Sequence, residues 1–259
     1  MDIVVCVKRV PLTQEVDLEI TPEGREIKKD SLVYVMNDWD NYAVEEAVLL
    51  QEKFGGSVTA VTIGDEEDEE VLRRALAMGA DRAIRIEPGE RQLDSFVVSR
   101  ILAQVIREIP HDIVLTGVQA DDDNCGMVGI MLAEHLHLAH AAVVTGMEPE
   151  NGEAEIKMEL EGGIDEISRI KLPAVLSIQT GINEPRYVSI MGIRKARKKE
   201  LKVVDLGDLN IPEEDLAPRT VVEEFFLPPE TAGAEFIEGD ATFVAEKILE
   251  IIKEKGGIG

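Results

Sequence analysis

The sequence has few cysteines and few basic residues. Cys6 and Cys125 are the only cysteines among 259 residues, which excludes a disulfide framework and favours a reducing compartment, so we expect a cytoplasmic protein. The chain has 27 basic and 52 acidic residues, which gives a net charge of −25. Nucleic acid is therefore not an expected partner, because its phosphates need Lys and Arg. A basic protein partner and an ordinary acidic surface both remain open.

Long apolar runs are also absent. No run approaches the roughly 20 residues of a membrane span, and the apolar part of MDIVVCVKRVP is too short for a secretory signal. We therefore expect no direct membrane insertion. Since 44 % of the residues are hydrophobic, the chain can still bury a core.

The signatures of several common active sites are missing as well. The sequence contains no G-x-x-x-x-G-K-[ST], G-x-G-x-x-G, G-x-S-x-G or Cys-x-x-Cys, and no Ser-Gly-Gly of the kind that binds pyrophosphate in ATP-dependent ligases. His135, His137 and His140 do not share one helix face, and the acidic run at 121–123 is typical of a solvated loop, so we expect no metal site.

Strand-like and helix-like segments alternate over the first 140 residues. The apolar runs at 2–9, 57–64, 81–87 and 111–117 predict buried strands, and amphipathic segments at 41–55, 65–80, 93–109 and 126–136 predict helices. This order predicts an α/β fold with a mostly parallel sheet flanked by helices.

The pattern changes after this region. Segments 139–147, 153–163, 167–173 and 174–180 predict strands, some of them paired as hairpins. Loop residues dominate from about Lys202, and 241–256 predicts a last amphipathic helix. We predict an α/β domain over 1–190 and a C-terminal arm over 191–259 that packs on another protein. A loop-rich return over the chain's own domain is the alternative.

The loop VQADDDNCGMVG, residues 118–129, is the main candidate for a binding site. It follows a predicted strand, and its glycines precede a helix whose free N–H groups can hold a phosphate. Asp122 is a candidate cap of this turn. An ordinary capped helix start, with no ligand, is the alternative. Trp39, the only tryptophan, also follows a predicted strand, either as a core aromatic or as a ring against a flat ligand.

Several blocks of the sequence resemble the beta subunit of electron transfer flavoprotein. They are VCVKRVP, MNDWDNYAVEEAVLLQEK, RRALAMGADRA, VLTGVQADDD, ELEGG, LPAVLSIQTGINEPRY and IRKARKK, and together they cover nearly the whole chain. The Asn-x-Trp-Asp form and HAAVV are most similar to the branch whose partner is trimethylamine dehydrogenase.

The resemblance implies a Rossmann-like, adenine-nucleotide alpha-hydrolase-like fold in a heterodimer. The alpha subunit holds most of a redox-active FAD, and the arm of the beta subunit embraces it. The beta subunit binds a structural AMP, or a second FAD in members that bifurcate electrons. The pair is an electron carrier rather than an enzyme: it takes electrons from an acyl-CoA or amine dehydrogenase and passes them to a quinone-linked or other acceptor. A stand-alone nucleotide-binding module is the alternative.

The resemblance also assigns site residues. The nucleotide pocket uses Cys6, Asn37, Ile63, Gly64, Asp122, Asn124, Cys125, Gly126, Met127, Val128 and Gly129. Trp39 falls where an aromatic ring approaches the flavin. The partner recognition loop comprises Ile182, Asn183, Glu184, Pro185, Arg186 and Tyr187, with Ile182 as an apolar anchor and the polar residues as its rim.

Two departures from the family pattern bear on the ligand. A thiol at Cys125 replaces a hydroxyl, and Met127 replaces an amide. Both changes weaken a pyrophosphate site, and we therefore expect AMP rather than a second FAD. The basic residues from Arg194 to Lys199 lie where the predicted domain meets the arm, and they either face the alpha subunit or offset the acidic surface.

Overall fold

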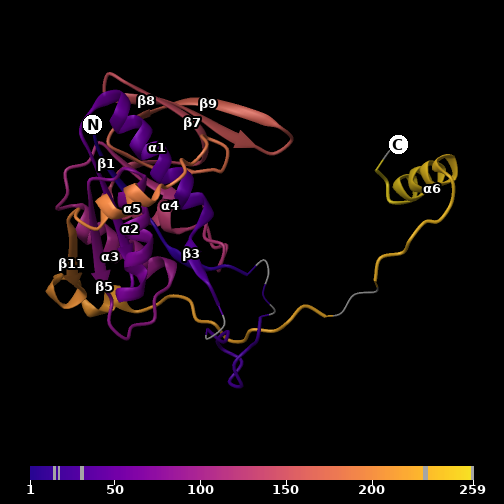
Figure 1. Ribbon diagram of the computed structural model, residues 1–259, viewed down its shortest axis with the longest axis horizontal. Helices are drawn as coiled ribbons and strands as arrows, with labels where there is room; N and C mark the ends of the chain where they lie inside the picture. Colours follow the sequence, from indigo (N-terminus) through magenta and orange to yellow (C-terminus); the bar gives the residue numbers. More distant parts are fainter. Residues whose placement is uncertain (14–15, 17, 30–31, 230–232, 258–259) are drawn as a thin grey trace.

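The computed structural model describes residues 1–259 except 14, 15, 17, 30, 31, 230–232, 258 and 259. Its body is a sheet of nine strands in the order β11-β5-β4-β1-β6-β10-β7-β8-β9 (Figure 1). The strands from β11 to β7 run parallel, and β8 and β9 are antiparallel additions. Their bounds are β1 Asp2–Cys6, β4 Ser57–Ile63, β5 Arg82–Glu87, β6 Ile113–Gly117, β7 Ala139–Glu150, β8 Glu153–Leu160, β9 Ile164–Lys171, β10 Ala174–Ile178 and β11 Leu201–Asp205. A separate ladder pairs β2 Arg9–Pro11 with β3 Tyr34–Met36.

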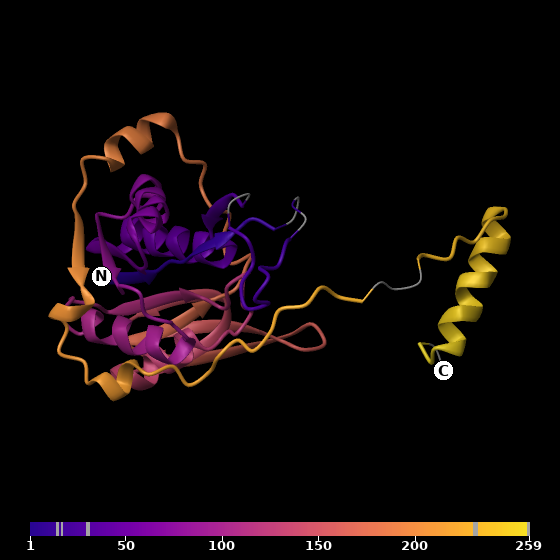
Figure 2. The ribbon, with the colours of Figure 1, turned by 90° about the horizontal axis from the view of Figure 1, so that it is seen from below.

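Helices cover both faces of this sheet (Figure 2). One hydrophobic cluster lies under α1, α2 and α5, and the other lies under α3 and α4. Successive residues of β1 alternate between them: Ile3 and Val5 belong to the first cluster, Val4 and Cys6 to the second. This explains the continuous apolar run of the strand. The helices are α1 Asp38–Phe54, α2 Glu69–Met78, α3 Ser95–Ile106, α4 Val128–Leu136, α5 Ile190–Ala196 and α6 Ala241–Glu254, with short 3-10 turns at Glu66–Asp68, Leu206–Asp208 and Glu213–Leu216.

The predicted α/β class, the flanking helices, the added hairpin and the arm with its last helix are confirmed, whereas three local predictions were wrong. Helix α1 begins at Asp38 rather than 41, so Trp39 lies inside its first turn. Strand β9 begins at Ile164, three residues early. Strand β11 replaces the start of the expected loop, and helix α5, for which no prediction was made, covers part of the basic tract. Since β11 is an exposed edge strand, pairing with β5, not a buried apolar run, decides its conformation.

The strand order reverses beside β1. Strand β1 pairs with β4 on one side and with β6 on the other, all three in parallel. The carboxyl ends of these strands therefore meet at one edge of the sheet, at Cys6, Ile63 and Gly117. In open α/β sheets, ligands bind outside this edge at the reversal point.

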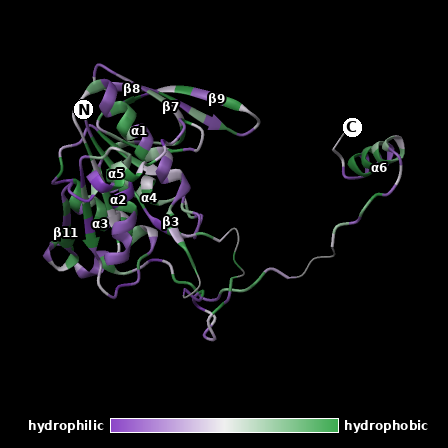
Figure 3. Ribbon diagram, in the orientation of Figure 1, coloured by the Kyte–Doolittle hydropathy of each residue, from purple (hydrophilic) through white to green (hydrophobic). Residues whose placement is uncertain are grey.

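The C-terminal segment first follows the body and then leaves it. Asp94 accepts hydrogen bonds from the backbone N–H groups of Arg219 and Thr220, at 2.6 and 2.9 Å, and Phe225 N donates to Gly24 O. Beyond this point the segment extends to α6, which stands apart from the body (Figure 1). Helix α6 carries both hydrophobic and hydrophilic residues (Figure 3) and buries none of them. The position of the boundary between 190 and 191 stays a prediction. Among the described residues, no helix has the length and apolar character needed to cross a bilayer.

Candidate functional site

A cavity opens at the carboxyl edge of β1, β4 and β6. Its empty volume is about 980 Å³, a figure that includes open solvent at its mouth. Eight of the residues assigned to the nucleotide pocket from the sequence line it: Cys6, Asn37, Ile63, Cys125, Gly126, Met127, Val128 and Gly129. Three more, Gly64, Asp122 and Asn124, lie outside its described lining, as does Trp39.

Several polar residues of the lining were not predicted from the sequence, including Lys8, Asp40, Asp94, Ser95 and Thr116. Lys8 and Thr116 lie one residue before the ends of two predicted strands. Because ligands bind at the carboxyl ends of parallel strands, this position could have identified both residues as candidates. Asp94 and Ser95 lie at the start of α3, and only the packing of α3 brings them to this edge.

Asn37 connects the start of α1 to the candidate phosphate loop. Its side chain is 1 % exposed. The amide Nδ2 donates to Gln119 O at 2.8 Å, and Oδ1 accepts from Asp121 N at 3.1 Å. Both ends of one buried amide thus hold the loop backbone, which gives Asn37 a structural role at the cavity wall.

Asp40 joins the ends of β1 and β6 at the cavity wall. Its carboxylate accepts from Lys8 N at 2.7 Å and from Gly117 N at 3.1 Å. Burial raises the pKa of Asp40 to about 7, although these hydrogen bonds oppose the shift. Burial of Cys6 raises the pKa of its thiol, and the negative charge of nearby Asp40 raises it further. Cys6 therefore lines the cavity as a protonated thiol and does not act as a nucleophile.

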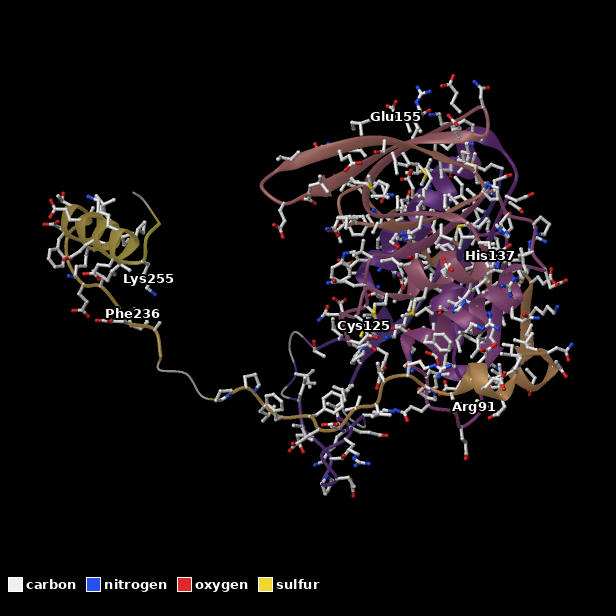
Figure 4. All side chains as sticks on the ribbon, turned by 180° about the vertical axis from the view of Figure 1, so that it is seen from behind. Arg91, Cys125, His137, Glu155, Phe236 and Lys255 are labelled. Atoms are coloured by element: carbon white, nitrogen blue, oxygen red, sulfur yellow. The ribbon has the colours of Figure 1, made fainter. Side chains whose placement is uncertain are left out.

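The acidic run of the loop is partly neutralised by Lys8. The Lys8 ammonium lies 2.6 Å from Asp122 Oδ1 and 3.1 Å from Asp123 Oδ2. The cap of the turn is Asp123 rather than the expected Asp122, because Asp123 Oδ1 accepts from Cys125 N at 2.9 Å while Asp122 pairs with Lys8. Cys125 is exposed, at the side of the body from which the arm leaves (Figure 4).

The start of α4 has the features of an anion site. Met127 at its N-cap makes no side-chain cap, so the first N–H groups of the helix are available to a ligand. Gly126, with φ of 61°, turns the chain into the helix. Gly129 allows α4 to pack closely against the sheet, because a Cβ at this position would lie 2.3 Å from Ser177 Oγ and 2.7 Å from Thr116 Oγ1.

The segment predicted to recognise a partner is fixed to α1. Asn183 Nδ2 donates to Tyr42 O and to Glu46, and Arg186 binds Glu45 and Glu52. Ile182 is only partly exposed and packs against the hydrophobic core. Side chains of Tyr187, Ile190 and Met191 are far more open, at 90, 70 and 67 % exposure. The exposed apolar surface therefore lies beyond the position expected from the sequence.

The three histidines have separate surroundings. His135 packs edge-on against Phe96, with ring centroids 5.6 Å apart, while His140 Nε2 lies 3.1 Å from Ser177 Oγ. His137 is exposed at the C-cap of α4. Within the described part of the chain, no three His, Cys, Asp or Glu side chains are grouped as metal ligands.

Comparisons with known proteins agree with this architecture. Residues 26–209 match the family described as Electron transfer flavoprotein domain. Three relatives named electron transfer flavoprotein subunit beta align over nearly their full length. The protein of Methylophilus methylotrophus is 38 % identical over 265 residues, covering 99 % of this chain and 100 % of the relative. That of Bacillus subtilis is 36 % identical over all of both chains, and that of Homo sapiens is 36 % identical over 96 % of this chain and 97 % of its own. The chain therefore belongs to the electron transfer flavoprotein beta-subunit family.

Proposed function

We propose that this chain binds AMP in the cavity and works in a heterodimer with an electron transfer flavoprotein alpha subunit, which holds most of the FAD. The pair carries electrons from a dehydrogenase to a redox acceptor; it is a carrier and not an enzyme. The observation that carries the proposal is the cavity at the reversal of strand order, closed by the uncapped start of α4.

The cavity supports AMP over a second FAD. The starts of α3 and α4 both line the cavity, but the α3 start is capped by Asp94, which accepts from Val97 N. Lys8, the lysine of the described lining, is already paired with Asp122 and Asp123. One phosphate can use the backbone N–H groups near Gly126 to Gly129, whereas a pyrophosphate brings more charge into an acidic loop. The apolar lining, including Val61, Ile63 and Leu102, suits a flat base.

The arm supports a large partner. Phe226, Leu227 and Phe236 are 77, 62 and 87 % exposed, and α6 presents Phe243 and Ile248 at 51 and 46 %. Figure 4 shows Phe236 on the extended segment, away from the body. Exposed apolar side chains on this scale mark an interaction surface, and we assign this surface to the alpha subunit.

A second surface suits a transient redox partner. Of the predicted loop, Asn183 and Arg186 serve as internal anchors, while Tyr187 projects outward together with Ile190 and Met191. Glu184 is exposed and Pro185 is partly exposed. We propose that an acyl-CoA or amine dehydrogenase docks here, with Ile190 rather than Ile182 as the apolar anchor. The acceptor is quinone-linked or another redox protein, and the setting is cytoplasmic.

Purification of the chain with an alpha subunit tests this function. We expect one FAD and one AMP per heterodimer, measured by flavin absorbance and by chromatography of the extracted nucleotides. Two FAD per heterodimer would favour the electron-bifurcating alternative. A stable monomer that holds a nucleotide but never recruits a flavin-bearing partner would favour a stand-alone nucleotide-binding module.

A further inference from the structure

We infer that Gln179 is a positioning residue that fixes the indole ring of Trp39, and that this ring faces the flavin held by the partner subunit. The inference rests on the proposed function for its purpose, but the contact is a feature of this chain alone. Trp39 Nε1 donates to Gln179 Oε1 at 2.8 Å. The two residues are 140 positions apart in the sequence, at the start of α1 and just after β10.

The Gln179 side chain is itself held in place. Its Oε1 atom accepts a second hydrogen bond, from Thr180 N at 3.0 Å. Two donors that meet at one atom identify the oxygen end of the amide and fix its orientation. Gln179 is thus a fixed acceptor before it receives the indole N–H, and the entropy lost on ordering the pair is small.

The backbone of Trp39 is fixed by different residues. Asn37 and Asp40, on either side of it, hold the first turn of α1 to the phosphate loop and to the ends of β1 and β6. Gly117 leaves room for this turn, because a Cβ there would lie 2.7 Å from Trp39 Cβ. These contacts fix the Trp39 backbone at the carboxyl edge of the sheet.

Trp39 is partly exposed and belongs to neither hydrophobic cluster of the described residues, and it lies outside the lining of the cavity. The hydrogen bond to Gln179 gives the indole N–H a fixed acceptor and so favours one orientation of the ring. A ring held in one orientation presents a constant contact surface to the partner, and the distance and angle between redox centres govern transfer.

Fluorine NMR can test the contact, because Trp39 is the only tryptophan. The full chain is labelled with 5-fluorotryptophan and studied alone and after assembly with unlabelled alpha subunit. Gln179→Met removes the acceptor at similar length, and Gln179→Glu keeps an oxygen acceptor. The matched control is Gln51→Met, which makes the same chemical change at a residue of α1 away from Trp39. Gln51 donates a hydrogen bond to Asp81.

We expect Gln179→Met to shift and broaden the single resonance in the chain alone, and Gln179→Glu to restore a sharp line. In the heterodimer, Gln179→Met should slow flavin reduction by the dehydrogenase while FAD and AMP contents stay unchanged; Gln51→Met should alter neither reading. An unchanged resonance in Gln179→Met, or an altered resonance with an unchanged rate, would overturn the inference. Failure of the wild-type chain to recruit a flavin-bearing subunit would refute the proposed function instead, and the spectrum of the chain alone would still decide the contact.

Discussion

Arg186 binds both carboxylate oxygens of Glu45. Its Nε lies 2.9 Å from Oε2 and its Nη2 lies 3.0 Å from Oε1, and the backbone N–H of Arg186 also donates to Oε2 at 3.0 Å. The Glu45 side chain is 4 % exposed and the Arg186 side chain is 32 % exposed, so the carboxylate is buried while the guanidinium still reaches water. It fastens the loop that precedes the exposed residues Tyr187 and Ile190 to the middle of α1.

We predict that Glu45→Gln lowers the free energy of unfolding by about 2 kcal/mol, because a buried charged acceptor of three hydrogen bonds is replaced by an amide. Denaturant unfolding measures the change. The matched control is Glu52→Gln, since Glu52 binds the same guanidinium but is 56 % exposed. We expect about 0.5 kcal/mol or less for the control. Equal losses in the two variants would contradict the dominant role of Glu45.

Asp40 should make stability depend on pH. Its pKa is about 7 in the folded chain and near the ordinary 3.8 in the unfolded chain, so the folded state binds more protons between these values. The free energy of unfolding therefore falls as pH rises from about 4 to about 7, and then levels off. Asp68, with a pKa raised to about 6 by burial and by Asp65, adds a trend of the same sign.

The contribution of Asp40 is isolated by Asp40→Asn, which cannot titrate. We expect the variant to show a shallower fall in unfolding free energy between pH 5 and pH 7.5 than the wild type. Denaturant titrations across this range measure both slopes. Parallel curves for the two proteins would show that Asp40 does not titrate in this window.

Gly129→Ala should damage both the fold and the nucleotide site. The added Cβ would overlap Ser177 Oγ and Thr116 Oγ1, so α4 has to move away from β6 and β10. We expect a loss of about 1–3 kcal/mol in unfolding free energy and weaker binding of AMP, measured by calorimetry on the heterodimer stripped of nucleotide.

Gly126→Ala is the contrasting variant. A Cβ at Gly126 meets no atom closer than 3.4 Å, and its cost arises from the positive φ, about 1 kcal/mol. Wild-type affinity for AMP in Gly129→Ala would exclude the start of α4 as the phosphate site.

Two isoleucines of one segment should behave differently. Ile190→Ala removes a side chain that is 70 % exposed, so we expect unchanged stability and flavin content but slower electron transfer from the dehydrogenase, followed by stopped-flow absorbance. Ile182→Ala removes a side chain that packs on the core, and we expect a loss of about 1 kcal/mol in stability. Slower transfer in Ile182→Ala alone, at unchanged stability, would return the anchor role to Ile182.

Local sequence patterns are enough to identify the strands and helices that form the layers of this α/β fold. Buried parallel strands need apolar side chains on both faces, so the runs around Val4, Val61 and Val114 identify the strands from local composition. Helix starts and glycines are local signals too, and they located the loop before α4. Strand-end reasoning reached the loop before α4, which includes Cys125, Gly126 and Met127. Cys6, Asn37 and Ile63 came from the resemblance to the family.

Only the tertiary structure decided which side chains meet and which stay exposed. Asp40 joins β1 to β6, Gln179 meets Trp39, and Arg186 meets Glu45, each across more than 30 residues of sequence. The exposure of Ile182 and Ile190 was likewise not readable, because two isoleucines in one polar stretch have the same local chemistry. Burial depends on how the loop is held against α1, and hydrogen bonds between distant residues hold it there.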